Sequence, residues 1–527
     1  MDIWSWICEL ESEFDSDSNP SLDFILASDG KREEESNRLI RLRAERTLGS
    51  DSEVLVTFNL CFEGFPSFDS RKPVWVSDAC PVSSDQPFGL PLVLQLLQEI
   101  VNRSPAMANT ICPRSQLQRL KPEPVSWIME SHSPESFSSF FNLVILTRLF
   151  WLCAWDAPSE VGSFYFQHLL CSNIDALTCK QAPAVLRTFL VSVGVDTELC
   201  LMRTLGYMLA KWIILRDVSV GLQSLVAPLP GQQLGISYAT EAHGFWTLKG
   251  YAPVNGMKLM HSNELPSIGA KGSLLRYALA HQQLEALIQL EYSVGFHDGY
   301  IQVNARVDNL RIDVAKLGFG KKSDDNDFLD ERHFPSRIRV WIGPEVGSTY
   351  VSGLTLGRST DNGEREVETQ RIIKGSLGNY SKASSPVKAR ARVSMKNKMK
   401  NWRWDQDAEG NAAVFDAVLC DNVTGHEIGS WKSFDNGGNG GNCFQNRYYG
   451  VNRPFTKSGG VVFAGDDYGE RVGWRLSREM EGSVLKWRIG GEVWLSYWPN
   501  NVRSSYVETR CVEWCDEVDL PLIPPGK

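Results

Sequence analysis

The chain has 527 residues, of which 43% are hydrophobic and 22% are charged, and its 54 basic and 63 acidic side chains give a formal net charge of −9. These values exclude a single small module and a globally disordered chain, because they match a globular protein long enough for three or four folding units. The acidic balance argues against a surface wholly devoted to nucleic acid, so any basic site must be local.

The first thirty residues carry acidic side chains and no Lys or Arg. Secretory signals and organelle transit peptides both need basic residues, so this stretch contradicts both. The 12 cysteines show no CxxC motif and no regular spacing, which is typical of proteins from a reducing compartment. We therefore expect a protein of the cytoplasm or the nucleus.

Helical patterns dominate the first part of the chain. Residues 1–89 are expected to form an acidic N-terminal segment with short β elements, and residues 90–289 a helical domain. Two apolar stretches, 140–155 and 199–215, are short for a membrane span and contain charged residues, so they predict buried helices and no transmembrane segment. The apolar spacing over 274–288 predicts the last helix of this domain.

Strand patterns dominate residues 290–527. Apolar residues alternate with polar ones from Tyr300 to Val314, with one slip at Asp308-Asn309, which predicts a strand with a β-bulge. An Asp298-Gly299 turn joins this strand to the one before it. The chain is therefore expected to be α+β, with a mostly helical N-terminal domain followed by an antiparallel β-sandwich or barrel.

Tryptophans are concentrated in this C-terminal half. Gly490-Gly491 predicts a tight hairpin, which would place Trp487 opposite Trp494 and give the sheet an aromatic face. Such a face is either a wall of the hydrophobic core or a surface for a ligand. The sequence leaves both readings open.

A strongly basic segment stands out in this acidic chain. No acidic residue occurs from Lys374 to Arg403, and the Ser, Gly and Ala content predicts a mobile insert between strands at about 357–403. The insert could contact an anionic membrane or nucleic acid, with two tryptophans as anchors, or it could be a nuclear-import tract. It could equally be a solvated linker whose two tryptophans start the next strand. The candidate binding residues are Lys388, Arg390, Arg392, Lys396, Lys398, Lys400, Arg403, Trp402 and Trp404.

Catalytic motifs are lacking in the sequence. It contains no GxSxG, no HExxH and no protein-kinase motif set, and no two histidines have metal-ligand spacing, so no metal or cofactor is expected. An enzyme site would have to be assembled from distant residues in a cleft between the two halves. The candidates for such a site are His297, Asp298, His333 and His426.

Several segments, among them GYIQVNARVDNLRIDVAKLGF, KNWRWDQDAEGNAAVFDAVLCDNVTGHEIGSW and MDIWSWICEL, resemble a protein family of higher plants. The resemblance extends over nearly the whole chain. It implies a plant origin and no activity, and it assigns a role to no residue.

The sequence favours a non-enzymatic binding or adaptor protein with a protein partner, because a Trp-dense sheet occurs without a catalytic set. Two alternatives stay open. One is an enzyme with its site between the helical and β halves, and the other is a carrier of lipids or hydrophobic ligands if the β domain is a hollow barrel.

Overall fold

The computed structural model describes most of the chain. The described residues are 2–15, 20–30, 37–49, 53–69, 72–82, 85–107, 119–173, 183–217, 235–254, 282–318, 332–360, 365–377, 387–399, 401–421, 425–428, 454–456, 459–465, 468–498 and 510–524.

The N-terminal part combines one helix with a small antiparallel sheet. Strands β1, β2 and β3 pair in order, and β4 and β5 both pair with β3. Helix α1 packs along α4 farther down the chain, where Trp4 contacts Phe137 and Phe141. The bounds are α1 Ile3–Asp15, β1 Ser21–Ser28, β2 Leu39–Leu48, β3 Val54–Glu63, β4 Trp75–Val76 and β5 Cys80–Pro81.

Helices follow, and they share a single hydrophobic core with this small sheet. The Ser133 hydroxyl accepts a hydrogen bond from the Ser136 amide and caps α4, and Pro134 occupies the first turn. The stretches 140–155 and 199–215 are helical, and the first of them is buried, both as predicted. The bounds are α2 Leu90–Arg103, α3 Pro122–Ser131, α4 Pro134–Phe150, η2 Trp151–Trp155, α5 Ser159–Phe164, η3 Tyr165–Leu170, α7 Ala184–Ser192 and α8 Val195–Asp217.

The remaining strands form two large antiparallel sheets and a separate hairpin. One sheet has the order β12-β18-β10-β9-β8-β7, with β17 and β6 also on β10, and the other has the order β15-β16-β11-β19-β20. The bounds are β6 Ala106–Met107, β7 Ile236–Ala242, β8 Phe245–Val254, β9 Gln282–Phe296, β10 Tyr300–Gly318, β11 Arg332–Pro344, β12 Val351–Leu356, β13 Arg365–Leu377, β14 Val387–Met399, β15 Trp402–Glu409, β16 Ala412–Leu419, β17 Val461–Ala464, β18 Arg471–Ser477, η6 Arg478–Met480, β19 Val484–Trp498 and β20 Arg510–Pro521.

The two large sheets, called the β unit below, share one hydrophobic core. Trp487 of β19 stacks on Trp246 of β8 at 5.4 Å between ring centroids, and it meets Trp474 of β18 edge-on at 4.6 Å. Both contacts join one sheet to the other. The tryptophans of the described strands therefore serve mainly to fill the space between the sheets.

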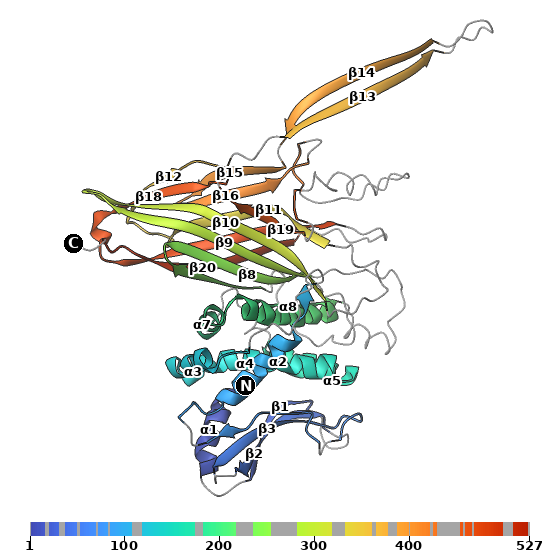
Figure 1. Ribbon diagram of the computed structural model, residues 1–527, viewed down its shortest axis with the longest axis vertical. Helices are drawn as coiled ribbons and strands as arrows, with labels where there is room; N and C mark the ends of the chain where they lie inside the picture. Colours follow the sequence, from blue (N-terminus) through green and yellow to red (C-terminus); the bar gives the residue numbers. More distant parts are fainter. Residues whose placement is uncertain are drawn as a thin grey trace, which may run out of the picture.

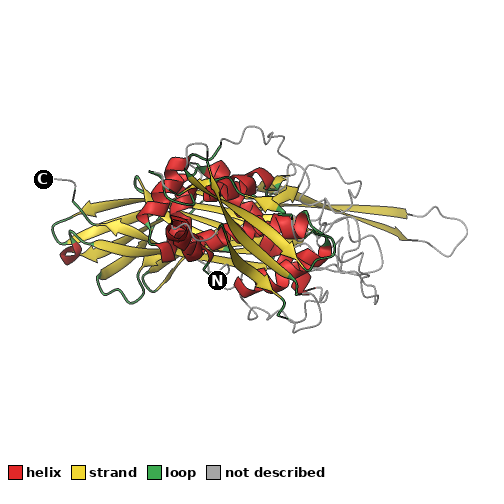
Figure 2. Ribbon diagram, turned by 90° about the horizontal axis from the view of Figure 1, so that it is seen from below, coloured by secondary structure: helices red, strands yellow, loops and turns green. Residues whose placement is uncertain are grey.

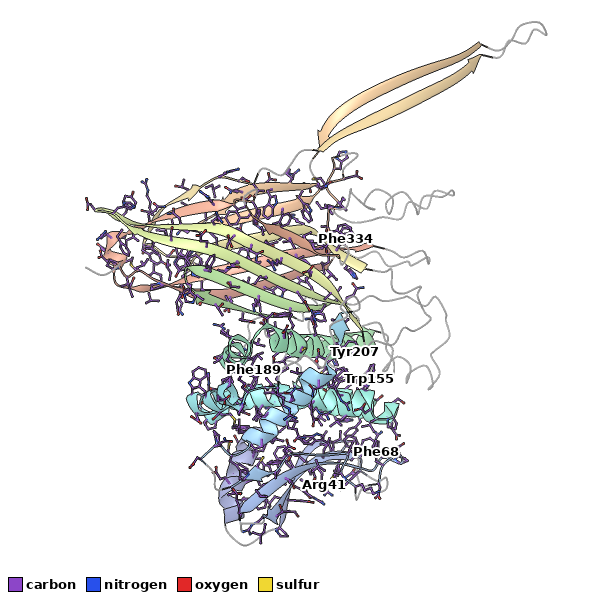
Figure 3. All side chains as sticks on the ribbon, viewed as in Figure 1. Arg41, Phe68, Trp155, Phe189, Tyr207 and Phe334 are labelled. Atoms are coloured by element: carbon purple, nitrogen blue, oxygen red, sulfur yellow. The ribbon has the colours of Figure 1, made fainter. Side chains whose placement is uncertain are left out.

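Helices α7 and α8 lie against the β unit, and the N-terminal sheet lies on the far side of the helical layer (Figure 1). Three ion pairs cross from these helices to the strands. They are Arg187 to Asp516 at 2.8 Å, Lys249 to Glu198 at 2.6 Å and Arg203 to Glu285 at 2.7 Å. Figure 3 shows Tyr207 and Phe189 in this layer, below the β unit.

Two sequence predictions about this region are wrong. The described part of the stretch 274–288 is the strand β9, in which Leu284, Ala286 and Ile288 are buried at every second position. The change from helix to strand therefore occurs between Asp217 and Ile236, well before residue 290. The apolar residues matched a helical period only because a few of them also lie three or four positions apart.

The hairpin predicted at Gly490-Gly491 is also wrong, since β19 continues through both glycines. A Cβ atom at Gly490 would lie 2.0 Å from the Trp341 indole of the neighbouring strand, and one at Gly491 would lie 2.7 Å from Ile288. These glycines make room for neighbouring side chains and do not form a turn. As a result, Trp487 and Trp494 lie on opposite faces of β19.

Two local predictions are confirmed. Strands β9 and β10 form a hairpin around Asp298-Gly299, with a hydrogen bond from the His297 amide to the Tyr300 carbonyl. The register of this pair shifts between Val307 and Asn309, so Asp308 is the bulge residue. The chain is α+β as expected, and the strands described form no closed barrel.

Candidate functional site: the arm and its base

Strands β13 and β14 form a two-stranded sheet of their own, called the arm below. Each strand has 13 residues, which corresponds to a length of about 40 Å at about 3.3 Å per residue. No other described strand pairs with either of them. The arm projects away from the β unit in both views (Figures 1 and 2).

The register of the arm separates two kinds of residue. Residues at alternate positions of a strand share a face, and directly paired residues share it too. One face, the apolar face, contains the rungs Leu377–Val387, Gly375–Ala389 and Ile373–Ala391. The opposite face, the cationic face, contains Lys374 paired with Arg390, Ile372 with Arg392 and Ser376 with Lys388.

Charge is unevenly distributed along the cationic face. Near the base, acidic and basic positions face each other, because Glu366 is paired with Lys398 and Glu368 with Lys396. Farther out, Lys374 is directly opposite Arg390, an arrangement of like charges that destabilises an isolated sheet. The outer half of the arm therefore carries positive charge that an anionic partner would neutralise.

The basic segment thus has a defined conformation where a mobile loop was expected. Of the candidate binding residues, Lys388, Arg390, Arg392, Lys396 and Lys398 all belong to β14. Lys400 lies outside the described residues.

The other three candidates belong to the β unit. Arg403 forms ion pairs with Asp405 at 2.9 Å and Glu427 at 2.6 Å. Trp402 and Trp404 are only 5% and 7% exposed. Their expected role as stacking or interfacial anchors is therefore wrong, because the sheet that they enter covers their rings.

Two short segments, called legs below, connect the arm to the β unit. The legs and the groups that hold them are called the arm base. The first leg comprises residues 357–360, and it runs beside β18. The Gly357 amide donates to the Arg471 carbonyl at 2.8 Å, and the Arg471 amide donates to the Arg358 carbonyl at 3.2 Å. At its end, the Thr360 amide donates to the carboxylate of Glu470 at 2.7 Å.

The second leg is the start of β15, and apolar packing holds it. Trp402 meets Phe463 at 5.5 Å between ring centroids, and Trp404 contacts both Phe463 at 5.0 Å and Tyr468 at 5.2 Å. The Trp402 indole also donates to the Pro454 carbonyl at 3.0 Å. Burial raises the pKa of Tyr468 well above its ordinary value, and the nearby Glu470 carboxylate acts in the same direction.

The predicted bulge in β10 lies at the same place. Strand β18 pairs with β10 up to Arg306, and β17 pairs with β10 from Asn309 onward. The chain between β17 and β18 therefore leaves the sheet opposite the bulge, and its last residue before β18, Glu470, accepts a hydrogen bond from the Val307 amide at 3.0 Å. The arm base is thus built on the longest strand of the β unit.

The histidines proposed for an enzyme site lie apart. His333 is buried and contacts Gln282 at the start of β9, at 3.2 Å, whereas His297 stacks on Tyr300 just past the end of β9. The 15 residues of β9 separate the two by about 50 Å. Figure 3 shows Phe334, the neighbour of His333, at the end of the β unit away from the β9–β10 turn.

The remaining enzyme candidates, His426 and Asp298, lie at the surface of the β unit. His426 is exposed, and Asp298 lies in the β9–β10 turn beside His297. Among the described residues, no group of three or more His, Cys, Asp or Glu could hold a metal ion.

The described tryptophans leave no broad aromatic surface. Trp474, Trp487 and Trp514 are fully buried. Trp494 is half-buried, and the Arg337 guanidinium lies 4.8 Å from its ring centroid. Trp431 lies outside the described residues, as does the side chain of Trp498. An aromatic recognition face thus finds no support in the described sheet.

One helical stretch of the described chain, Pro134–Trp155, has the length and apolar composition of a membrane span, and 89% of its most apolar window is buried inside the protein.

No protein-family model matches the sequence, and no curated protein matches it significantly. Among solved structures, the Clostridium perfringens NetB toxin in its membrane-inserted form is 10% identical at a TM-score of 0.20, covering 55% of this chain and 99% of the toxin. The Clostridium perfringens delta-toxin is 8% identical at 0.19, covering 54% and 99%, and a pore-forming protein is 11% identical at 0.16, covering 55% and 94%. Likeness at such TM-scores supports no conclusion about fold or function.

Proposed function

We propose that this chain is a non-enzymatic binding protein that attaches to anionic membrane surfaces through the arm. The observation that carries the proposal is the separation of apolar and cationic positions onto the two faces of a hairpin that no other described strand covers. Amphipathic elements of this composition lie in the membrane interface, with the apolar face toward the acyl chains and the cations at the level of the lipid headgroups.

The length of the apolar face favours shallow insertion. Its three fully apolar rungs extend over five residues of each strand, from Ile373 to Leu377 and from Val387 to Ala391. Five residues correspond to about 17 Å, well short of the roughly 30 Å hydrocarbon core that a spanning segment must cross. Arg371, paired with Val393, ends the apolar stretch on the side of the base. The arm is therefore suited to one leaflet.

A membrane surface fits the arm better than nucleic acid does. A nucleic-acid site would use the cationic face together with aromatic rings for stacking on bases, and the two nearest tryptophans are buried. It would also leave the apolar face in water. An anionic membrane engages both faces, since each Lys or Arg near the surface contributes about 1 kcal/mol and the apolar rungs add burial.

The rest of the fold acts as a scaffold in this proposal. We take the two facing sheets of the β unit to form a β-sandwich. The legs of the arm are attached to one end of this sandwich, and helices α7 and α8 pack against it elsewhere. Its role is to present the arm to the membrane and to leave the remaining surface free for a protein partner.

Vesicle co-sedimentation tests the proposal. The full chain is expected to pellet with vesicles of phosphatidylcholine and phosphatidylserine, to bind pure phosphatidylcholine far less, and to be released by salt. The triple variant Lys388→Gln, Arg390→Gln, Arg392→Gln should lose about 3 kcal/mol, or roughly a hundredfold in affinity, at about 1 kcal/mol per charge.

A matched control removes three exposed lysines elsewhere, by Lys72→Gln, Lys121→Gln and Lys486→Gln. It should bind nearly as well as the unchanged protein. Equal losses in both triple variants would refute a role for the arm, and so would binding to single-stranded RNA without binding to anionic vesicles.

A further inference from the structure

The direction of the arm depends on its base. No described strand pairs with β13 or β14 from outside, so no sheet contact along their length fixes how they leave the β unit. The second leg is held by buried rings, whereas the first leg is held by hydrogen bonds. A group that orders the first leg therefore gives the arm base a second fixed point, and two fixed points are needed to hold the arm in one direction.

Glu470 is the group on which these hydrogen bonds converge. Its Oε1 atom accepts from the Thr360 amide at 2.7 Å and from the Ser359 hydroxyl at 3.1 Å. Its Oε2 atom accepts from the side-chain amide of Gln406, which also donates to the Arg358 carbonyl at 3.1 Å. One carboxylate thus joins the first leg of the arm to β15, the strand that receives the second leg.

The surroundings of Glu470 make this arrangement costly to disturb. Its side chain is 0% exposed, and among the described residues no Lys or Arg forms an ion pair with it. A buried carboxylate without a cation is tolerated only when hydrogen-bond donors surround it. Losing the Gln406 donor would leave Oε2 unsatisfied, and losing both leg donors would leave Oε1 unsatisfied, so the leg and the carboxylate hold each other in place.

The main chain of Glu470 fixes the same point to the centre of the sheet. Its carbonyl accepts from the Val307 amide at 3.0 Å, next to the bulge in β10. The neighbouring Gly469 amide donates to the Thr360 hydroxyl at 3.2 Å. The first leg is therefore tied to the longest strand of the β unit through two adjacent residues.

We propose that Glu470 is the positioning residue that fixes the direction of the arm relative to the β unit. This inference rests on the proposed function, because a fixed direction matters only if the arm contacts a partner. An arm held in one direction loses less conformational freedom on reaching a membrane than an arm that swings at its base, so Glu470 raises the affinity without touching the lipid.

The test compares Glu470→Gln with a rescue variant. In Glu470→Gln the new amide group faces the amide group of Gln406, so two donors meet where an acceptor and a donor met before. In the double variant Glu470→Gln, Gln406→Glu the polarity of this contact is reversed, and the oxygen of the introduced amide still accepts from Thr360, but the hydrogen bond from residue 406 to the Arg358 carbonyl is lost. Exposed Glu481 provides the control substitution Glu481→Gln.

Hydrogen exchange followed by mass spectrometry measures the first leg without any membrane. The amides of residues 357–360 should exchange at least about tenfold faster in Glu470→Gln, as expected for losing a hydrogen bond to a charged acceptor. They should slow in part in the double variant, which restores the contact between residues 470 and 406 but not the hydrogen bond to the Arg358 carbonyl. The amides of β9 should be unchanged, which separates a local effect from general unfolding. Ser359→Ala removes one donor without altering the carboxylate and should give a smaller effect in the same direction.

Vesicle binding then links the base to the arm. Glu470→Gln is expected to bind anionic vesicles several-fold more weakly, although it changes no residue of the arm, and Glu481→Gln to bind normally. Unaltered exchange in the first leg would overturn the positioning role. If the leg loosens as expected while even the unchanged protein ignores vesicles, the membrane proposal fails and the structural role of Glu470 stands.

Discussion

Adjacent isoleucines of β13 allow a direct test of which face of the arm meets the membrane. Ile373 is paired with Ala391 on the apolar face, and Ile372 is paired with Arg392 on the cationic face. Ile373→Ser and Ile372→Ser remove the same apolar group, keep the same net charge and sit one position apart in the same strand. Any difference in vesicle affinity between the two variants therefore depends on the face of the arm to which each isoleucine belongs, and not on the change in composition.

The expected difference follows from burial of a single side chain. Moving an isoleucine from water into an apolar environment contributes about 1.5–3 kcal/mol, so Ile373→Ser should weaken binding to anionic vesicles roughly ten- to hundredfold. Ile372→Ser should change binding less than about threefold, because this position stays at the level of the headgroups.

Co-sedimentation over a range of lipid concentrations gives both affinities, and circular dichroism checks that the two variants keep the same strand content. Equal losses would mean that attraction of charges alone holds the arm to the membrane. A larger loss for Ile372→Ser would reverse the proposed orientation of the faces.

Three further predictions concern the scaffold. Trp487→Ala should lower the free energy of unfolding by about 3–5 kcal/mol, because the ring is fully buried between the sheets. Trp494→Ala, at a half-buried position, should lower it by less than about 1 kcal/mol. Urea titration measures both values, and equal losses would contradict the placement of Trp487 in the core of the β unit. Deletion of Asp308 should preserve cooperative unfolding, because it removes only the unpaired residue of the bulge and leaves Val307 and Leu310 two positions apart on the same buried face; loss of the cooperative urea transition would disprove this. Burial lowers the pKa of Lys211 to about 7 from 10.5, so the unfolded chain binds the proton more tightly and stability falls as the pH decreases from about 10.5 to 7. Lys211→Met should therefore raise the urea midpoint more at pH 7 than at pH 10, and a gain independent of pH would argue against a charge buried at this site.

Local patterns predicted well where one or two neighbouring residues decide the conformation. The Asp298-Gly299 turn and the bulge at Asp308 were both visible in the sequence, because turn chemistry and a slip in alternation act over a few residues.

The arm was missed although its signal is present. Val387, Ala389, Ala391, Val393 and Met395 alternate with basic or polar residues, which is a strand pattern. Alanine is a weak strand former and dense charge is typical of disordered segments. The composition of the segment therefore predicted a mobile loop, although its periodicity indicates a strand. Testing this segment for two-residue alternation would have revealed it.

The arm base had no such signal. Glu470 is a single acidic residue in an ordinary stretch, and it gains a role only because residues 110 positions away in the chain donate to it. Such a contact is set by the path of the chain between strands, and no short-range pattern encodes it.

The sequence by itself determined the α+β class, the predominance of strands in the C-terminal half, the buried apolar helices and the basic segment in an acidic chain. These properties depend on composition and on the spacing of apolar residues along one element. Only the tertiary structure decided that Gly490 makes room for Trp341 within a continuous strand and that Trp402 and Trp404 are buried. Only it showed that the basic segment is a free-standing hairpin with one apolar face. The physical reason is that burial and strand pairing depend on which distant element covers each face, and this is settled when the sheets pack together.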